Sequence, residues 1–296
     1  MFTKFSRSWE LTKQSWSVLR ADKHLMVFPL VSGVLTTLVC ISFFVPAVVV
    51  LGAMGAANGG GAPGSGTVHT DKMDPAMQAV WLGFMFLTYF VVNVIVTFFN
   101  ASLIACAVAR FNGEDSSATA GMKTALKRWP QILGWALVNA TVGTILQMLK
   151  ERAGFIGRIV IGLFGLAWTI ATFFVVPALV IEGLGPIAAV KRSTSVLKKT
   201  WGESLIAQSG VSLAMGLIGM AVFLPLVVGG VALLIAEQWV LGFGLIGLGI
   251  VLMMLITLVA STLKMILVAA CYRMATTGLI PEQFDGATLK GMFAKK

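Results

Sequence analysis

The chain has 296 residues, of which 57% are hydrophobic and 11% are charged, and its formal net charge is +10. Soluble domains carry about 25% charged residues, so this composition excludes an ordinary soluble protein and indicates a multi-pass membrane protein. The predicted spans and their short connections use nearly the whole sequence. We therefore expect a single integral membrane domain over residues 1–296, without a separate soluble catalytic domain.

Six apolar segments are long enough to cross a bilayer as helices, which takes about 20 residues each. The third segment is the shortest and contains the polar residues Asn139 and Gln147. The sequence therefore predicts an all-α fold, a polytopic bundle of six transmembrane helices. The predicted spans cover residues 27–54, 78–109, 131–149, 157–181, 205–236 and 240–272.

The stretch "GPIAAVKRSTSVLKKTW" lies between the fourth and fifth spans. At helical spacing, Ile187, Val190, Thr194, Leu197 and Trp201 share one face, and basic residues occupy the opposite face. This pattern is typical of a helix lying in the headgroup layer of a membrane. Similar patterns predict amphipathic interfacial helices at about 3–20, 117–129 and 186–201. The expected anionic-lipid-facing residues are Arg7, Lys13, Lys123, Lys127, Arg128, Lys191, Arg192, Lys198 and Lys199, and the expected interfacial anchors are Trp9, Trp16, Trp129 and Trp201.

The first and third of these segments align without gaps, with Arg7 opposite Arg192 and Trp16 opposite Trp201. Each of the three segments also precedes a pair of spans. This order predicts an internal repeat of three units, each an interfacial helix followed by a transmembrane hairpin. The alternative is that any segment beside a membrane accumulates Lys, Arg and Trp, so that the likeness does not reflect a repeat.

The distribution of positive charge predicts the orientation of the chain. Most of the 22 Lys and Arg residues lie on the side that holds both termini, so we expect both termini in the cytoplasm and the protein in a bacterial inner membrane. Lys150, Arg152 and Arg158 break this rule, because they connect the third and fourth spans on the opposite side. They indicate either a tight basic outer hairpin or different boundaries for these two spans.

Polar side chains inside the spans are costly and therefore informative. Lys264 lies nine residues before Arg273, and Asn100 lies ten before Arg110, so the two are expected at similar depth and within reach of a hydrogen bond. One interpretation is a polar pathway or headgroup pocket between spans two, four and six, with Lys264 as its charged element. The other is that Lys264 extends to the interface while the remaining polar groups hold helices together, at about 0.6 kcal/mol per hydrogen bond. The residues of this polar intramembrane belt are Asn93, Thr97, Asn100, Thr172, Thr257, Ser261 and Lys264.

Catalytic and metal-binding motifs are not evident. "GFGLIG", residues 242–247, matches GxGxxG but lies inside an apolar span, so its glycines, with Gly249, predict close helix packing instead of dinucleotide binding. The three cysteines are far apart and lack CxxC spacing, which indicates neither a disulfide framework nor a metal site. Glu182 is expected to cap a helix or pair with a nearby Arg. We expect no enzymatic activity, no cofactor and no metal.

Four segments resemble a bacterial family of six-span membrane proteins of unknown function: "FSRSWELTKQSWSVLRADKHLMVFPLVSG", "FFNASLIACAVARFNGED", "RWPQILGWALVNATVG" and "VVPALVIEGLGPIAAVKRSTSVLKKTWGE". The resemblance covers nearly the whole chain and implies the six-span architecture. "ALVIEGLGPIAAVKRSTSVLKKTW" alone is more loosely similar to the membrane domain attached to some glycerophosphodiesterases. That domain is the non-catalytic part, so the resemblance implies no active-site residues.

The expected partners follow from where the charge lies. The basic residues are spread along one membrane face beside tryptophans, which favours anionic lipid headgroups over nucleic acid. We expect a non-enzymatic protein that binds or moves a lipid or small amphiphile. The alternative is a membrane scaffold that recruits a protein partner, or a second copy of this chain, and has no transport path.

Overall fold

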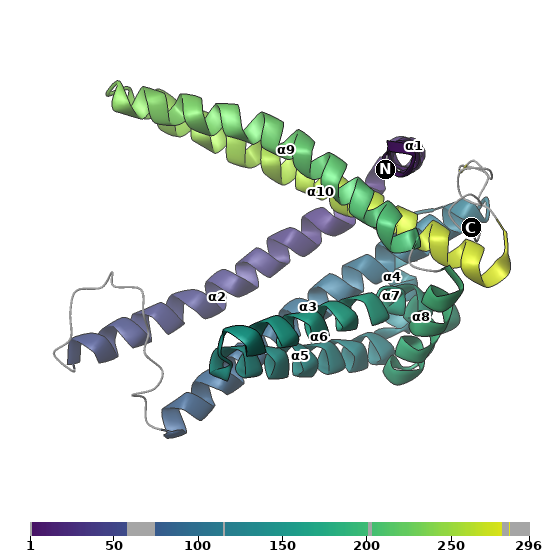
Figure 1. Cartoon of the computed structure of the whole chain (residues 1–296), viewed down its shortest axis with the longest axis horizontal. Coiled ribbons are helices and arrows are strands. Elements are labelled where there is room, and N and C mark those ends of the chain that lie inside the picture. Colours follow the sequence, from purple (N-terminus) through teal and green to yellow (C-terminus); the bar gives the residue numbers. More distant parts are fainter. Residues whose placement is uncertain (1, 58–74, 115, 201–202, 280–283, 285–296) are drawn as a thin grey trace.

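The computed structural model describes residues 2–57, 75–114, 116–200, 203–279 and 284, and of residues 2–9, 11, 47–57, 75–78, 199–200 and 203–214 it describes the backbone alone. This part of the chain consists of helices and short connections (Figure 1). In chain order the elements are α1 (Phe2–Ala21), η1 (Lys23–Met26), α2 (Val27–Ala57), α3 (Pro75–Phe111), α4 (Ala118–Lys127), α5 (Trp129–Arg152), α6 (Phe155–Ala171), α7 (Val175–Pro177), η3 (Ala178–Glu182), α8 (Pro186–Thr200), α9 (Glu203–Ile235) and α10 (Trp239–Thr277).

Six helices in this part of the chain are long and apolar enough to cross a membrane, which confirms the six predicted spans. Between 11% and 44% of each apolar window is buried inside the protein, so most of this apolar surface faces outward. Exposing it to water would cost about 25 cal/mol per Å², and hydrocarbon avoids that cost. The chain is a multi-pass membrane protein. The candidate spans are Lys23–Pro46, Ala79–Phe111, Trp129–Arg152, Phe155–Glu182, Met215–Ile235 and Trp239–Thr277.

Packing is dense at one end of the molecule, which we call the base. There α1, α4 and α8 gather around the adjoining ends of α3, η3 and α10 (Figure 1). Helix α3 is the central element and contacts α2, α4, α5 and α10, which is why its span is the most buried of the six. The buried cluster of the base includes Leu25, Phe28, Leu103, Phe174, Val196 and Tyr272.

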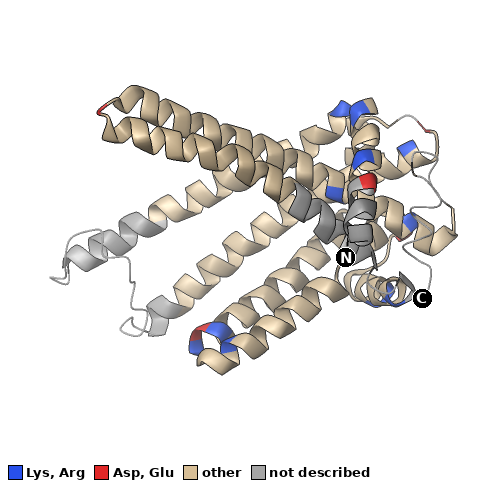
Figure 2. Ribbon diagram, turned by 45° about the horizontal axis from the view of Figure 1, so that its top comes forward, with Lys and Arg blue, Asp and Glu red and all other residues tan. Residues whose placement is uncertain are grey.

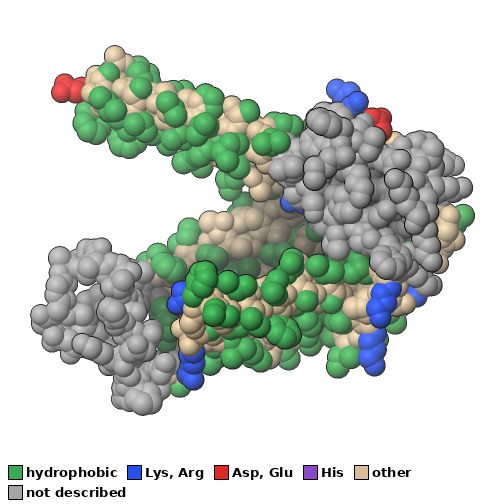
Figure 3. All heavy atoms as spheres, in the orientation of Figure 1, with side chains coloured by type: hydrophobic (Ala, Val, Ile, Leu, Met, Phe, Trp, Pro, Cys, Tyr) green, Lys and Arg blue, Asp and Glu red, His purple; other side chains and the backbone are tan. Residues whose placement is uncertain are grey.

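Away from the base the long helices separate into two arms. The α9–α10 arm (residues 215–258) leaves the base in one direction, and α3, α5 and α6 form the second arm. Helix α2 contacts α3 and extends between the two arms (Figure 1). Figure 3 shows a wide opening between the two arms that closes toward the base. Figure 2 shows Lys and Arg mainly at the ends of the helices, including the α5–α6 turn far from the base.

Glycine packing holds the α9–α10 arm together. A Cβ atom at Gly242 would lie 2.9 Å from the carbonyl oxygen of Gly230, and one at Gly249 would lie 3.2 Å from the Cβ atom of Leu226. The prediction of close helix packing is therefore confirmed for these two glycines. Gly244 and Gly247, by contrast, face open space.

Helices α1, α4 and α8 form where amphipathic helices were predicted. Each precedes a pair of long helices, as the three-unit arrangement requires, but a repeat and a location in the headgroup layer stay predictions. Ser117 starts α4, since its hydroxyl accepts a hydrogen bond from the Ala120 N–H at 3.2 Å. Gly121 and Ala125 then pack α4 directly against α3.

Candidate functional site

The fourth span is interrupted near the base. Helix α6 ends at Ala171, the chain turns, and the span resumes at Val175 and continues as the π-helical segment η3. Pro177 explains this break, because it has no N–H to donate and its ring would clash with the carbonyl of Phe173 in a regular helix. Pro46 and Pro225, in contrast, lie inside α2 and α9.

A side chain of α8 satisfies the backbone at this break. The N–H of Phe174 donates a hydrogen bond to the hydroxyl of Ser193 at 2.9 Å, in a fully buried position. A buried N–H without a partner costs about 1–3 kcal/mol, so Ser193 stabilises both the break and the docking of α8. Ala189 and Val196 lie on the same buried face of α8.

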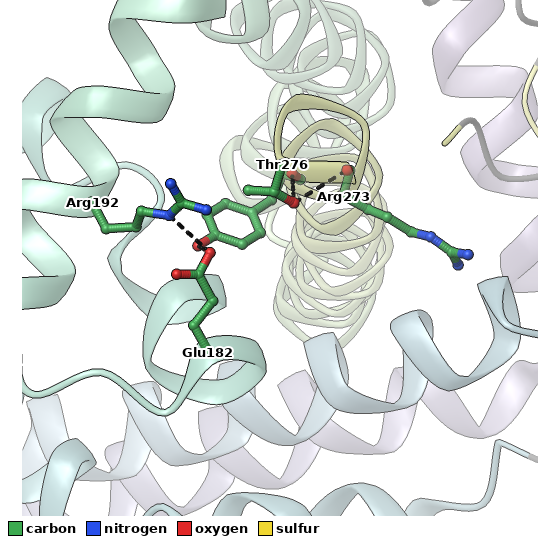
Figure 4. Close-up of polar contacts among 5 residues, drawn as sticks. Glu182, Arg192, Arg273 and Thr276 are labelled. Atoms are coloured by element: carbon green, nitrogen blue, oxygen red, sulfur yellow. Dashed lines mark hydrogen bonds and ion pairs between the residues drawn. The ribbon is translucent and has the colours of Figure 1, made fainter. Parts of the chain in front are cut away.

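Beyond the break, Glu182 joins three elements (Figure 4). Its Oε1 atom accepts hydrogen bonds from Arg192 Nε at 2.8 Å and from the Tyr272 hydroxyl at 2.6 Å. The hydrogen bond with Glu182 raises the pKa of the Arg192 guanidinium, which stays charged. These contacts tie η3 to α8 and α10 and confirm the prediction that Glu182 pairs with a nearby Arg. Arg273 extends away from this Glu182 cluster, as Figure 4 shows.

A second polar cluster joins α3, α5 and α6. Asn139 Nδ2 donates to Asn93 Oδ1 at 2.6 Å, and Trp168 Nε1 donates to Asn139 Oδ1 at 3.1 Å. Asn93 Nδ2 in turn donates to the carbonyl of Tyr89 at 2.8 Å. The side chains of this Asn139 cluster therefore hydrogen-bond largely to one another, and these bonds hold the three spans together at one depth.

An open groove of about 600 Å³ runs beside the Asn139 cluster, between the facing sides of α5 and α6. Trp135 and Lys150 mark its ends on α5, about 22 Å apart at about 1.5 Å per residue. Thr172 lines the groove and directly follows the last residue of α6, so the groove lies next to the break in the fourth span. The lining residues are Tyr89, Trp135, Asn139, Gly143, Leu146, Gln147, Lys150, Gly162, Gly165, Leu166, Trp168, Thr169 and Thr172.

Glycines create the space in this groove. A Cβ atom at Gly162 would meet nothing within 4 Å, and one at Gly165 would meet only Leu146, at 3.9 Å. On the α5 side the ring of Tyr89 covers the bare backbone of Gly143, where a Cβ atom would lie 2.6 Å from the ring. The groove is thus wide along α6 and walled by an aromatic ring from α3.

The lining can offer a ligand hydrogen bonds, apolar surface and one cation, Lys150, but no carboxylate, imidazole or thiol. No group of three or more His, Cys, Asp and Glu residues among the described residues could hold a metal ion. No disulfide joins the three cysteines, of which Cys106 and Cys271 are buried and Cys40 is exposed. The arrangement therefore supports binding by shape, hydrogen bonds and charge.

The structure separates the predicted polar belt. Asn93 belongs to the Asn139 cluster and Thr172 lines the groove, whereas Thr257 and Ser261 donate to carbonyls of their own helix. Thr97 is buried, and Asn100 and Lys264 are half-buried. No hydrogen bond or ion pair joins Asn100 to Lys264 in the described part of the chain. The groove lies between α5 and α6, with Tyr89 of α3 at its wall, so it joins spans two, three and four. Span six, α10, packs mainly along α9.

The predicted basic and Trp residues lie mostly on the surface of the base. Arg128 is an exception, since its guanidinium packs on Gly183, where φ is +68°. Arg192 belongs to the Glu182 cluster. The side chains of Arg7, Trp9, Lys199 and Trp201 lie outside the described residues. Exposed members of the set are Lys13, Trp16, Lys123, Lys127, Trp129, Lys191 and Lys198.

Reasoning from the sequence missed Ser193, Tyr272 and Trp168. Ser193 could have been found from the small-residue spacing of Ala189, Ser193 and Val196 on one face of α8. Tyr272 bonds a residue 90 positions away, and no local pattern predicts that contact.

Comparison with known proteins places the chain by family alone. No curated protein and no solved structure matches it. The looser resemblance to the membrane domain of glycerophosphodiesterases stays a prediction. A family model described as "Family of unknown function (DUF6159)" matches residues 79–281, which contain both polar clusters and the groove. Because this match spans more than half of the sequence, the chain belongs to that family of unknown function.

Proposed function

We propose that this protein is a non-enzymatic membrane protein that binds or moves a lipid or small amphiphile through the groove between α5 and α6. The observation that carries the proposal is the groove itself. Its volume of about 600 Å³ falls within the range of small-ligand sites, about 300–1,000 Å³. It also brings Lys150 and the Asn139 cluster to one surface of the spans, where polar groups are costly.

The break in the fourth span supports movement as well as binding. Transporters commonly form their substrate sites at interrupted transmembrane helices, where backbone groups are available to a ligand. Here Thr172 belongs to the groove and also follows the last residue of α6. The base end of the groove therefore adjoins the break, where the Phe174 N–H is bonded to Ser193 of α8.

The membrane setting is part of the proposal. In a bacterial inner membrane with both termini in the cytoplasm, α1, α4 and α8 lie in the cytoplasmic headgroup layer. Helix α4 and the start of α5 give the best support, because Met122 and Leu126 of α4 and Trp129 of α5 are exposed beside the exposed Lys123 and Lys127. Apolar and basic side chains on adjoining faces favour an interface rich in anionic lipid.

A scaffold without a transport path is the alternative function. Ile187 favours it, since this side chain is 70% exposed on α8 and lies one turn from the exposed Lys191. An exposed apolar side chain beside a basic one is suited to contact with a protein partner or a second copy of this chain. Such a protein would retain no specific lipid.

Reconstitution into liposomes with a panel of fluorescent lipids and ions separates these functions. We expect lipid retention or lipid flux above that of empty liposomes, and loss of both in Gly162→Leu, which adds a side chain where a Cβ atom meets nothing within 4 Å. Gly247→Leu is the matched control, because this glycine faces open space on α10, away from the groove. Absence of retention and flux in the unmodified protein would favour the scaffold.

A further inference from the structure

The two ends of the groove differ in charge. At the end far from the base, the α5–α6 turn carries Lys150, Arg152 and Arg158 against a single carboxylate, Glu151. Arg158 is held on this turn, because its Nε donates to the carbonyl of Ala153 at 3.2 Å. Figure 2 shows the cluster of positive charge at this turn. Among these residues Lys150 alone lines the groove, so an anion entering there meets its ammonium group.

Toward the base the groove offers little to a charged ligand. Its walls are Leu146, Leu166 and the glycines of α6, and it ends at Trp135 and Trp168, whose rings stack with centroids 6.0 Å apart. The Trp168 N–H is already bonded to Asn139. The Thr169 and Thr172 hydroxyls donate to carbonyls of their own helix. This part of the groove is therefore suited to hydrocarbon.

The length of the groove fits a lipid chain. A bilayer with its headgroup regions is about 40–45 Å thick, so one phospholipid reaches about 20–22 Å from its headgroup to its chain end. The groove extends about 22 Å along α5 at about 1.5 Å per residue, from the charged turn to the Trp pair. One acyl chain can thus lie along it while its headgroup stays at the membrane surface beside Lys150.

We infer that the ligand of the groove is an anionic phospholipid from the leaflet on the α5–α6 turn side, with its phosphate on Lys150. One acyl chain lies along Gly162 and Gly165 and ends at Trp135 and Trp168. This inference rests on the proposed function and deepens it by naming the lipid class, its orientation and its leaflet. The Asn139 cluster then acts by holding the walls of the groove in position.

The test measures lipid bound to the purified full-length chain by native mass spectrometry. The probes are phosphatidylglycerol and phosphatidylcholine with identical chains. We expect Lys150→Gln to reduce phosphatidylglycerol binding about fivefold, the effect of removing one Lys near an anionic surface, and to leave phosphatidylcholine binding unchanged. Lys150→Arg should retain binding, because it keeps the charge. Lys23→Gln is the control, since Lys23 is an exposed cation on η1 at the base.

A second arm separates a lipid from a free phosphate. Soluble glycerol phosphate carries the headgroup chemistry without a chain, and we expect it not to displace bound phosphatidylglycerol at equal concentration. Displacement would overturn the assignment of the acyl chain. Equal losses in Lys150→Gln and Lys23→Gln would overturn the assignment of the phosphate while leaving lipid binding intact. No retention of either lipid by the unmodified protein would overturn the proposed function itself.

Discussion

Helix α10 is predominantly apolar in both halves, yet the two halves have different surroundings. From Ala260 to Tyr272 most side chains are buried, because this half packs against α1, α3 and α8 in the base. From Trp239 to Val259 most side chains are exposed, and the buried ones include Gly242 and Gly249, which face α9. Hydropathy therefore indicates that a segment leaves water, but it does not indicate whether protein or lipid covers it.

The same difference separates the base from the arms in general. In the base, buried side chains and buried polar groups depend on one another, as Ser193 and Phe174 do. In the arms, lipid chains replace protein neighbours and can follow a change in shape. Substitutions of the same residue type should therefore lower the free energy of unfolding strongly in the base and weakly in the arms. Each pair of variants below tests this contrast.

The largest difference is expected for two leucines of α10. Leu263 is 1% exposed and Leu255 is 48% exposed. Leu263→Ala should lower the free energy of unfolding by about 2–5 kcal/mol, because it leaves a cavity in a packed core. Leu255→Ala should lower it by less than about 1 kcal/mol, because lipid fills the space. Reversible unfolding in mixed micelles measures both, and equal losses would contradict the contrast.

The next largest effect is expected at the break in the fourth span. Ser193→Ala removes the acceptor for the buried Phe174 N–H and should cost about 1–3 kcal/mol of stability. Ser195→Ala on the same helix is the control, because Ser195 is exposed, and its effect should stay within about 0.5 kcal/mol. The unfolding experiment described for the leucines applies here as well. A neutral Ser193→Ala would mean that the break does not depend on α8.

A smaller effect is expected in the arm formed by α3, α5 and α6. Asn139→Leu removes two interhelical hydrogen bonds, and at about 0.6 kcal/mol each the loss should be about 1 kcal/mol. Thr141→Val is the control, since the Thr141 hydroxyl donates to Leu137 of its own helix. A loss as large as that of Leu263→Ala would show that this arm is packed like the base.

The sequence predicted the helices well because length and periodicity determine them. The six spans follow from runs of apolar residues, and α1, α4 and α8 follow from basic and apolar residues at helical spacing. These features depend on neighbours along the chain, which the sequence shows directly. The break at Pro177 was not predicted, since Pro46 and Pro225 stand in similar apolar runs and lie inside α2 and α9.

The contacts between helices could not be predicted in the same way. In a membrane the apolar faces toward lipid and toward protein have similar composition, so hydropathy does not show which faces meet. The polar belt was therefore assigned to spans two, four and six, whereas the groove joins Tyr89, Asn139 and Thr172 of spans two, three and four. Small residues carry the better signal, as Gly121 against α3 and Gly249 against α9 show.

The smallest effect on stability is expected for Lys264, which lies near the boundary between the two halves of α10. This side chain is half-buried, and no hydrogen bond or ion pair is found for it in the described part of the chain. Placing an ammonium group at hydrocarbon depth is costly, so Lys264→Leu should leave stability unchanged or raise it by up to about 1 kcal/mol. Binding of phosphatidylglycerol should also be unchanged, because Lys264 does not line the groove. A clear loss of lipid binding with unchanged stability would instead place a second ligand contact at the opening between the arms, and the base would then contribute to function as well as to packing.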